Sequence, residues 1–113
     1  MLGPMQLVWQ WLAAFALTVA IEVPIASVLL RGPRGRRVVL AVVAQCASHP
    51  AVWFIFPELP VRYRVMLILA ESWAVLSETA IYALLGDGVS WRRAFGVSLL
   101  ANTASYLAWP LLR

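Results

Sequence analysis

The chain alternates between long apolar stretches and short polar connections. Four stretches, at residues 5–30, 38–56, 65–85 and 94–112, contain few charged side chains. An α-helix needs roughly 20 such residues to cross the hydrocarbon core of a bilayer. The pattern predicts an all-α integral membrane protein, a bundle of four transmembrane helices in which residues 1–113 form one transmembrane domain. Because the connections are short, consecutive helices should run antiparallel.

Polar side chains within these stretches are few and fall at helical spacings. Gln45 and His49 are four residues apart, and Glu71 and Glu78 are seven apart. Residues at these spacings share one face of a helix, so the polar faces should turn toward one another and away from lipid. The polar core predicted in this way contains Glu22, Gln45, His49, Glu71, Glu78, Asn102 and Ser105.

The two halves of the chain carry similar polar patterns. A shift of 56 residues places Glu22 on Glu78, and a shift of 57 places Gln45 on Asn102. The paired helices would run in the same direction, which predicts two parallel (direct) repeats of a helical hairpin around an axis along the membrane normal. Near this axis Glu22 should face Glu78. The predicted repeat halves are residues 5–56 and 65–112.

The composition indicates lipid rather than water as the main environment. Hydrophobic residues make up 63% of the chain, charged residues make up 12%, and the mean hydropathy is +0.83. Soluble domains are about half apolar and about a quarter charged. A soluble fold of this length would leave too much apolar surface in contact with water. The lipid bilayer is therefore the first expected partner.

The basic residues mark the connections between helices. The net charge is +4, and all nine basic residues are arginines. They flank apolar stretches instead of forming a basic face on a soluble domain, which argues against nucleic-acid binding. Six of the nine lie around the first and third connections. The positive-inside rule then places residues 31–37 and 86–93 in the cytoplasm and both termini outside, with a bacterial inner (plasma) membrane as the expected location.

Carboxyl groups inside the membrane provide the candidate chemistry. Two carboxylates close together in a medium of low dielectric constant cannot both stay ionised, so Glu22 and Glu78 should share a proton or bind a cation. His49 is the expected proton partner of Glu71. Carboxylates and a histidine on facing helices are also metal-ligand types, although the Glu-x-x-His motif of di-metal bundles is absent. A metal ion is thus a candidate cofactor, with Glu22, His49, Glu71 and Glu78 as candidate ligands.

Two prolines and one cysteine also lie inside the apolar stretches. Pro24 and Pro50 follow ionisable residues and are predicted to break their helices, which would free backbone carbonyls beside the polar core. Cys46 is the only cysteine, so an intrachain disulfide is excluded. We expect it to be a small packing residue.

Three classes of function fit this pattern. The first is a small multi-pass membrane protein that binds or transports a proton, a cation or a small polar substrate through its Glu/His/Gln/Asn core. The second is an intramembrane enzyme acting on a lipid-soluble substrate, which needs one or two positioned acid-base groups; the sequence assigns no catalytic residue. The third is an accessory subunit of a larger membrane complex. A homodimer is compatible with each of the three.

Overall fold

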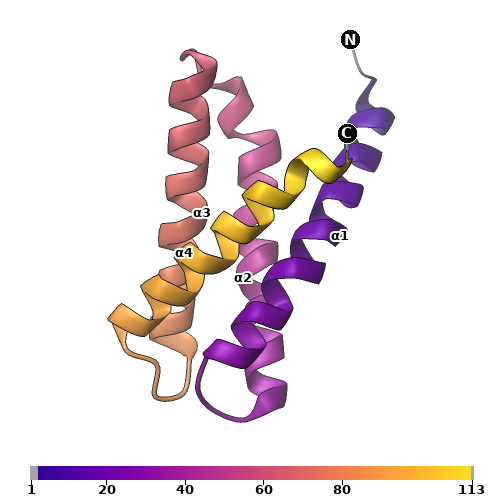
Figure 1. Ribbon diagram of the computed structural model, residues 1–113. Coiled ribbons are helices and arrows are strands. Elements are labelled where there is room, and N and C mark those ends of the chain that lie inside the picture. Colours follow the sequence, from indigo (N-terminus) through magenta and orange to yellow (C-terminus); the bar gives the residue numbers. More distant parts are fainter. Residues whose placement is uncertain (1–2, 113) are drawn as a thin grey trace.

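A computed structural model describes residues 3–112 of the chain, in which all regular secondary structure is helical and no β-strand occurs. Each of the four expected stretches coincides with one long helix. Two short 3-10 helices follow the second and fourth of them. The elements are α1 (Pro4–Leu29), α2 (Arg34–Phe54), η1 (Phe56–Glu58), α3 (Tyr63–Leu85), α4 (Trp91–Ala108) and η2 (Trp109–Leu112) (Figure 1).

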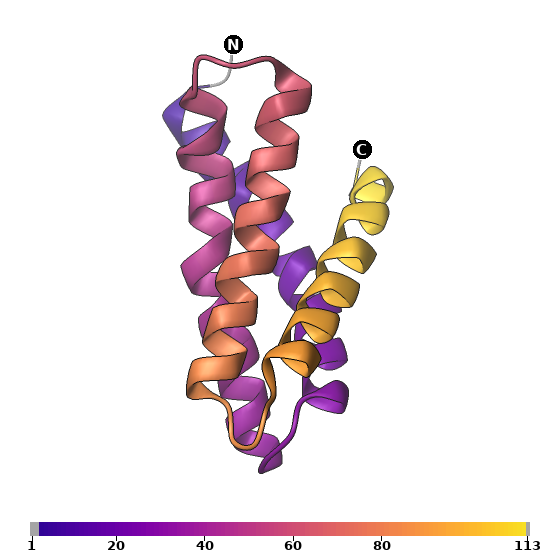
Figure 2. The same cartoon turned by 90° about the vertical axis from the view of Figure 1, so that its left-hand side faces the viewer.

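The helices run up and down, and each packs against its two neighbours in the order α1, α2, α3, α4 and back to α1. The bundle is 45 Å long, which exceeds the roughly 30 Å of a bilayer's hydrocarbon core. The α2–α3 connection lies at the same end as both termini, which we call the terminal end; the other two connections lie at the opposite end, the turn end (Figure 1). In both views α4 leans away from α3 toward the terminal end (Figures 1 and 2).

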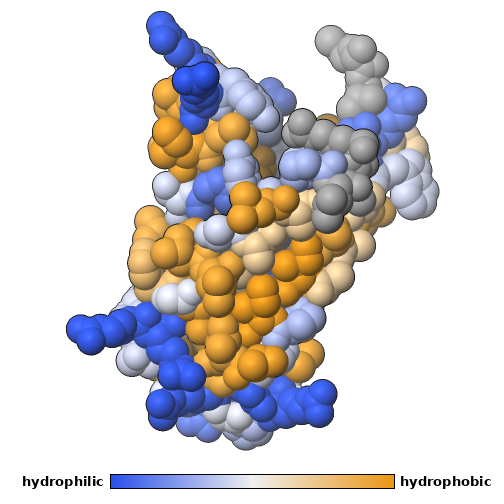
Figure 3. Space-filling view, viewed as in Figure 1, coloured by the Kyte–Doolittle hydropathy of each residue, from blue (hydrophilic) through white to orange (hydrophobic). Residues whose placement is uncertain are grey.

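Three helical segments are long and apolar enough to cross a membrane: Pro4–Leu29, Arg34–Glu58 and Tyr63–Leu85. Helix α4 is not among them, because its 18 residues include two arginines in the first turn and several polar side chains. The surface agrees with insertion in lipid, since apolar side chains cover the middle of the visible face and polar ones gather at its ends (Figure 3). The first three membrane spans are supported, and the fourth stays a prediction.

Small residues form the contacts between the helices, while large apolar side chains point outward. Val28 is 75% exposed and Leu107 is 69% exposed, although both lie in apolar stretches. Without water to drive burial, helices in a membrane associate through close packing of small residues. Eight alanines are buried between the helices: Ala14, Ala26, Ala41, Ala44, Ala70, Ala74, Ala94 and Ala101.

Each of the two connections at the turn end contains a glycine with a positive φ angle. Gly32 has φ 102° and Gly88 has φ 70°, a conformation that is strained for residues with a side chain. A Cβ atom on Gly32 would lie 3.0 Å from the Cβ atom of Asp87, so the two turns also approach each other closely. The glycines therefore both set the turns and allow them to pack together.

Two arginines connect the halves of the chain at this end. Arg36 of α2 donates from its guanidinium to the carbonyl of Leu85, the last residue of α3, at 2.8 Å. Arg93 of α4 donates through Nε to the carbonyl of Leu29, the last residue of α1, also at 2.8 Å. Carbonyls in the last turn of a helix have no partner within the helix, so each arginine completes a helix of the other half.

The prediction that the prolines break their helices is wrong. Helix α1 continues through Pro24 and helix α2 continues through Pro50 without a change of secondary structure. An interior proline removes one backbone hydrogen bond and strains the preceding turn, but the residues on both sides still support a helix of more than 20 residues. The polar core is therefore built from side chains on continuous helices.

Candidate functional site

Glu22 of α1 and Glu78 of α3 face each other at the centre of the bundle, as the comparison of the two halves predicted. Each is only 1% exposed. The amide nitrogen of Gln45 on α2 bridges them, donating to Glu22 Oε1 at 2.8 Å and to Glu78 Oε1 at 3.0 Å. The amide of Gln45 thus joins the two carboxyl groups. We call these two residues the glutamate pair.

The remaining donors to the glutamate pair come from both halves of the chain. Ser48 donates to Glu78 Oε2 at 2.9 Å, and Ser105 donates to Glu22 Oε2 at 2.6 Å. Asn102 donates to Glu78 Oε1 at 3.2 Å. All these donors are neutral, and within residues 3–112 no arginine pairs with either carboxyl group. Two buried acids are thus satisfied as hydrogen-bond acceptors but have no counter-charge from the protein.

The glutamate pair lies at the floor of a cavity of about 640 Å³ that all four helices line. The cavity extends from the pair to the terminal end of the bundle, where Trp53, Tyr63 and Trp109 line it. Apolar side chains, among them Val52, Met66 and Leu67, line it near this end. Figure 2 shows that α4 leans away from α3 toward the terminal end.

On the other side of the glutamate pair the bundle is closed. Small and apolar side chains from all four helices pack together toward the turn end. Tyr82, one helical turn beyond Glu78, is fully buried in this cluster. The pair is therefore accessible from one end only. The cluster contains Ala26, Leu30, Leu40, Ala41, Ala44, Tyr82, Val89, Ala94 and Val97.

His49 lies in the cavity wall. The sequence predicted that it pairs with Glu71, but its hydrogen-bond partners are different residues. The indole Nε1 of Trp11 donates to its Nδ1 at 3.0 Å, and its Nε2 lies 3.3 Å from Thr18 Oγ1. Because an indole can only donate, Nδ1 must be an acceptor, which makes the ring a neutral imidazole with its proton on Nε2. Both nitrogens are then engaged by α1, and the expected contact with Glu71 is absent.

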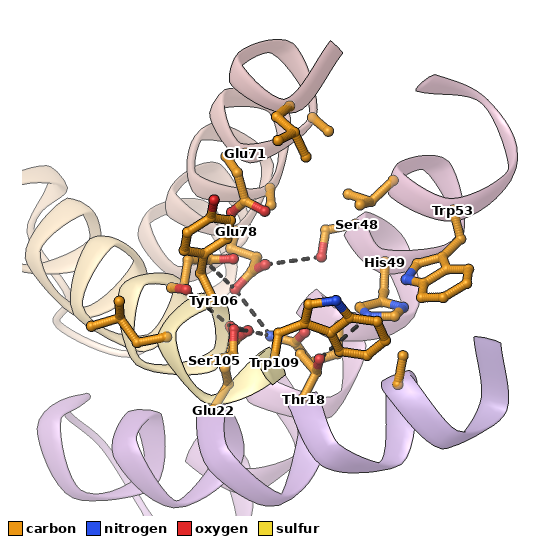
Figure 4. A pocket seen from close by; sticks show the side chains of 18 of the residues that line it. Thr18, Glu22, Ser48, His49, Trp53, Glu71, Glu78, Ser105, Tyr106 and Trp109 are labelled. Carbon is orange, nitrogen blue, oxygen red and sulfur yellow. Dashed lines mark hydrogen bonds between the residues drawn. The ribbon is translucent and has the colours of Figure 1, made fainter. Parts of the chain in front are cut away.

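Glu71 lines the same cavity two helical turns from Glu78, toward the terminal end (Figure 4). It is half-buried, and among the described hydrogen bonds none involves its carboxyl group. Nor do the described residues contain a group of three or more His, Cys, Asp and Glu side chains suited to a metal ion. The four candidate metal ligands thus lie around one cavity without forming a coordination site.

The sequence did not predict every residue of the site, and it predicted the wrong position for one residue beside it. Ser48 contacts the glutamate pair directly, and the shift of 57 residues that pairs it with Ser105 could have identified it. Trp11 and Thr18 bind His49 without any sequence signal that distinguishes them from other residues of α1. Cys46 is exposed on the outer surface of α2, so its expected role in core packing is wrong.

No protein-family model, curated protein or solved structure matches this chain. The chemistry of the site follows from three properties of the cavity: it is enclosed by the bundle, it opens at one end, and its floor holds two acids with neutral donors only. Such a floor can hold a proton between the carboxyl groups or accept a positive charge beside them.

Proposed function

We propose that this chain is a small transport protein of the membrane that exchanges a proton for a cation at the glutamate pair. The supporting observation is that two buried carboxyl groups at the floor of an open cavity have only neutral donors. An isolated charge is costly to bury, so this site is stable when protons or a bound cation balance its negative charge. Proton and cation then compete for the same place.

The charge balance gives the stoichiometry. With one proton shared between Glu22 and Glu78, the pair carries one negative charge, and a monovalent cation neutralises it. With a proton on each carboxyl group, the pair is neutral, and the arrival of a monovalent cation releases one proton. Loading from the neutral state therefore exchanges one proton for one positive charge.

The cavity favours an organic cation over a metal ion. Its volume of about 640 Å³ is in the range of drug-sized ligand sites. Aromatic side chains line the way in: the Trp53 and Trp109 ring centroids are 5.7 Å apart, and the Trp53 ring stacks on His49 at 6.5 Å. Aromatic faces attract cations and accommodate apolar substituents. We therefore propose an ammonium or phosphonium ligand with an apolar body.

We also propose that the two halves are direct repeats of one helical hairpin. The contact from Ser48 to Glu78 has a counterpart in the contact from Ser105 to Glu22, at the offsets of 57 and 56 residues found in the sequence. Each serine thus reaches the glutamate of the other half. Further pairs at these offsets share an environment: Gln45 with Asn102 at the carboxyl groups, Ala14 with Ala70 in the buried seam, and Gly32 with Gly88 at positive φ.

The proposed orientation has four spans in a bacterial inner membrane, with the terminal end outside and the turn end in the cytoplasm. The excess of arginines around residues 31–37 and 86–93 supports it. In this orientation the cavity opens to the outside and the cluster around Tyr82 closes the inner half. The described state is then outward-open.

The other two classes of function have less support. An enzyme using His49 as a base needs a free ring nitrogen, whereas both are engaged by Trp11 and Thr18. An accessory subunit would present its polar side chains on the outside, whereas Glu22, Gln45 and Glu78 are buried within one chain. Although a homodimer or a larger complex remains compatible with the site, neither is needed to complete it.

Calorimetry of the purified protein in lipid nanodiscs tests the proposal, with tetraphenylphosphonium as the probe. We expect saturable binding that weakens as the pH falls, and release of up to one proton per bound cation in weakly buffered solution. Glu22→Gln and Glu78→Gln should each weaken both, and the double variant should abolish them, because an amide can neither release a proton nor balance a charge. The matched control is Glu58→Gln, at an exposed position in η1. Binding that is independent of pH and unchanged in both glutamine variants would refute the exchange.

A further inference from the structure

A second hollow, of about 630 Å³, lies between α1 and α2 near the turn end. It shares no lining residue with the cavity above the glutamate pair. We call it the α1/α2 groove. Its wall combines apolar and basic side chains, among them Val23, Pro24 and Val28 of α1 and Arg34, Arg37 and Val38 of α2.

The basic side of the groove has unused hydrogen-bond donors. Arg37 donates through Nη1 to the carbonyl of Ser27, while its Nε is buried and has no acceptor among the described residues. A guanidinium carries five N–H groups in a planar fork that matches a phosphate group. Arg34, one helical turn away, is exposed. No acidic residue lines the groove, so two positive charges face it without a local counter-charge.

The start of α2 adds to this preference for an anion. The helix begins at Arg34, and its N-cap residue, Pro33, makes no side-chain hydrogen bond to the first turn. The first backbone N–H groups of a helix lack acceptors within it and carry the positive end of its dipole. These N–H groups lie in the same turn as the two arginines that line the groove. The helix start and the arginines therefore both favour a negatively charged group.

The apolar side of the groove leads away from the arginines. Val23, Pro24 and Val28 follow α1 back from the turn end, and Val28 is 75% exposed. In a segment apolar enough to span the membrane, such a surface contacts acyl chains. An occupant that satisfies both sides therefore has an anionic head and an apolar chain.

We propose that the α1/α2 groove binds one anionic phospholipid of the leaflet that surrounds the turn end. The phosphate lies between Arg34, Arg37 and the first turn of α2, and an acyl chain lies against Val23 and Val28. The groove thus fixes a lipid at the turn that joins the helices carrying Glu22 and Gln45. This site is independent of the proposed exchange, because the two share no residue.

Native mass spectrometry of the protein released from mixed phosphatidylglycerol and phosphatidylcholine nanodiscs tests the site. We expect one retained phosphatidylglycerol per chain. Arg34→Gln and Arg37→Gln should each weaken retention about fivefold, the effect of one basic residue near an anionic membrane. Arg34 is exposed, so its replacement tests the charge without disturbing a buried contact. Arg92→Gln is the matched control, because Arg92 is exposed on α4 and does not line the groove.

Three results would overturn this site. The first is equal retention of the two lipids by the wild type, or a phosphatidylglycerol preference that survives both Arg34→Gln and Arg37→Gln. The second is displacement of the lipid by millimolar inorganic phosphate, which would mean that the arginines select a free anion and that the apolar wall contributes nothing. Loss of preference in Arg92→Gln to the same extent would attribute the effect to overall charge and would equally refute the groove.

Discussion

Replacing Glu78 tests the hydrogen-bond network around the glutamate pair. Its carboxyl group accepts from Gln45 and Asn102 through one oxygen and from Ser48 through the other. Glu78→Ala removes both carboxyl oxygens. The two donors on α2 and the one on α4 then lose Glu78 as an acceptor. Glu78→Gln keeps an acceptor oxygen for the two amides, and its new amide can donate to the Ser48 hydroxyl.

The expected loss of stability follows from the number of contacts. Hydrogen bonds between helices in a membrane contribute on average about 0.6 kcal/mol each, so three give roughly 2 kcal/mol. A donor left without an acceptor in a dry interior costs about 1–3 kcal/mol, so the loss of stability would be larger if the three donors stayed unsatisfied. Because Glu78 borders the cavity, water can enter the space that the shorter side chain leaves, and we expect Glu78→Ala to lower the free energy of unfolding by about 2–4 kcal/mol. Glu78→Gln should lower it by less than about 1 kcal/mol.

Equilibrium unfolding in mixed micelles with increasing dodecyl sulfate measures these differences. The matched control is Glu71→Ala on the same helix, because Glu71 lines the same cavity but takes part in none of the described hydrogen bonds. It should unfold like the wild type. If Glu78→Ala is no less stable than Glu71→Ala, the network does not hold the helices together, and the reasoning about the buried pair is wrong.

Three further predictions concern the frame of the bundle. Reporters inserted at Arg34 and at Pro60 should lie on opposite sides of the membrane; the same side for both would contradict the antiparallel hairpins. Gly32→Ala should destabilise the protein by about 1 kcal/mol or more, because of its positive φ and the nearby Asp87, whereas Gly35→Ala, with open space around it, should not. Cys46 should react with a charged maleimide only after the protein is unfolded, since it is exposed on a segment apolar enough to span the membrane and a thiol in lipid does not form the reactive thiolate.

Much of the frame could be predicted from the sequence. The length of each apolar stretch predicted the four helices, because an apolar segment avoids unsatisfied backbone groups in lipid only by becoming helical. The helical spacing of polar residues predicted which faces turn inward, and the comparison of the halves predicted that Glu22 lies opposite Glu78. These features depend on local geometry and on the cost of exposing a polar group to lipid.

Other parts of the site depend on tertiary geometry that a linear pattern does not contain. The contact of His49 with Trp11 requires the rotation and height of α1 relative to α2, which no spacing within either helix specifies. The cavity is lined by residues of all four helices, whose relative positions no pattern within one helix specifies. Cys46 lies directly beside Gln45 in the sequence, yet neighbouring residues on a helix point about 100° apart, so Cys46 is exposed on the outer surface and Gln45 faces the core.

The crossed contacts of Arg36 with Leu85 and of Arg93 with Leu29 have a consequence for how the protein is made. As the first hairpin leaves the ribosome, the last carbonyl of α1 has no arginine, because its donor, Arg93, belongs to α4. The first hairpin therefore stays incompletely capped until the start of α4 has been made. Under the direct repeat proposed above, two separate copies of one hairpin would supply these two contacts to each other, so joining the copies in one chain requires no new interface.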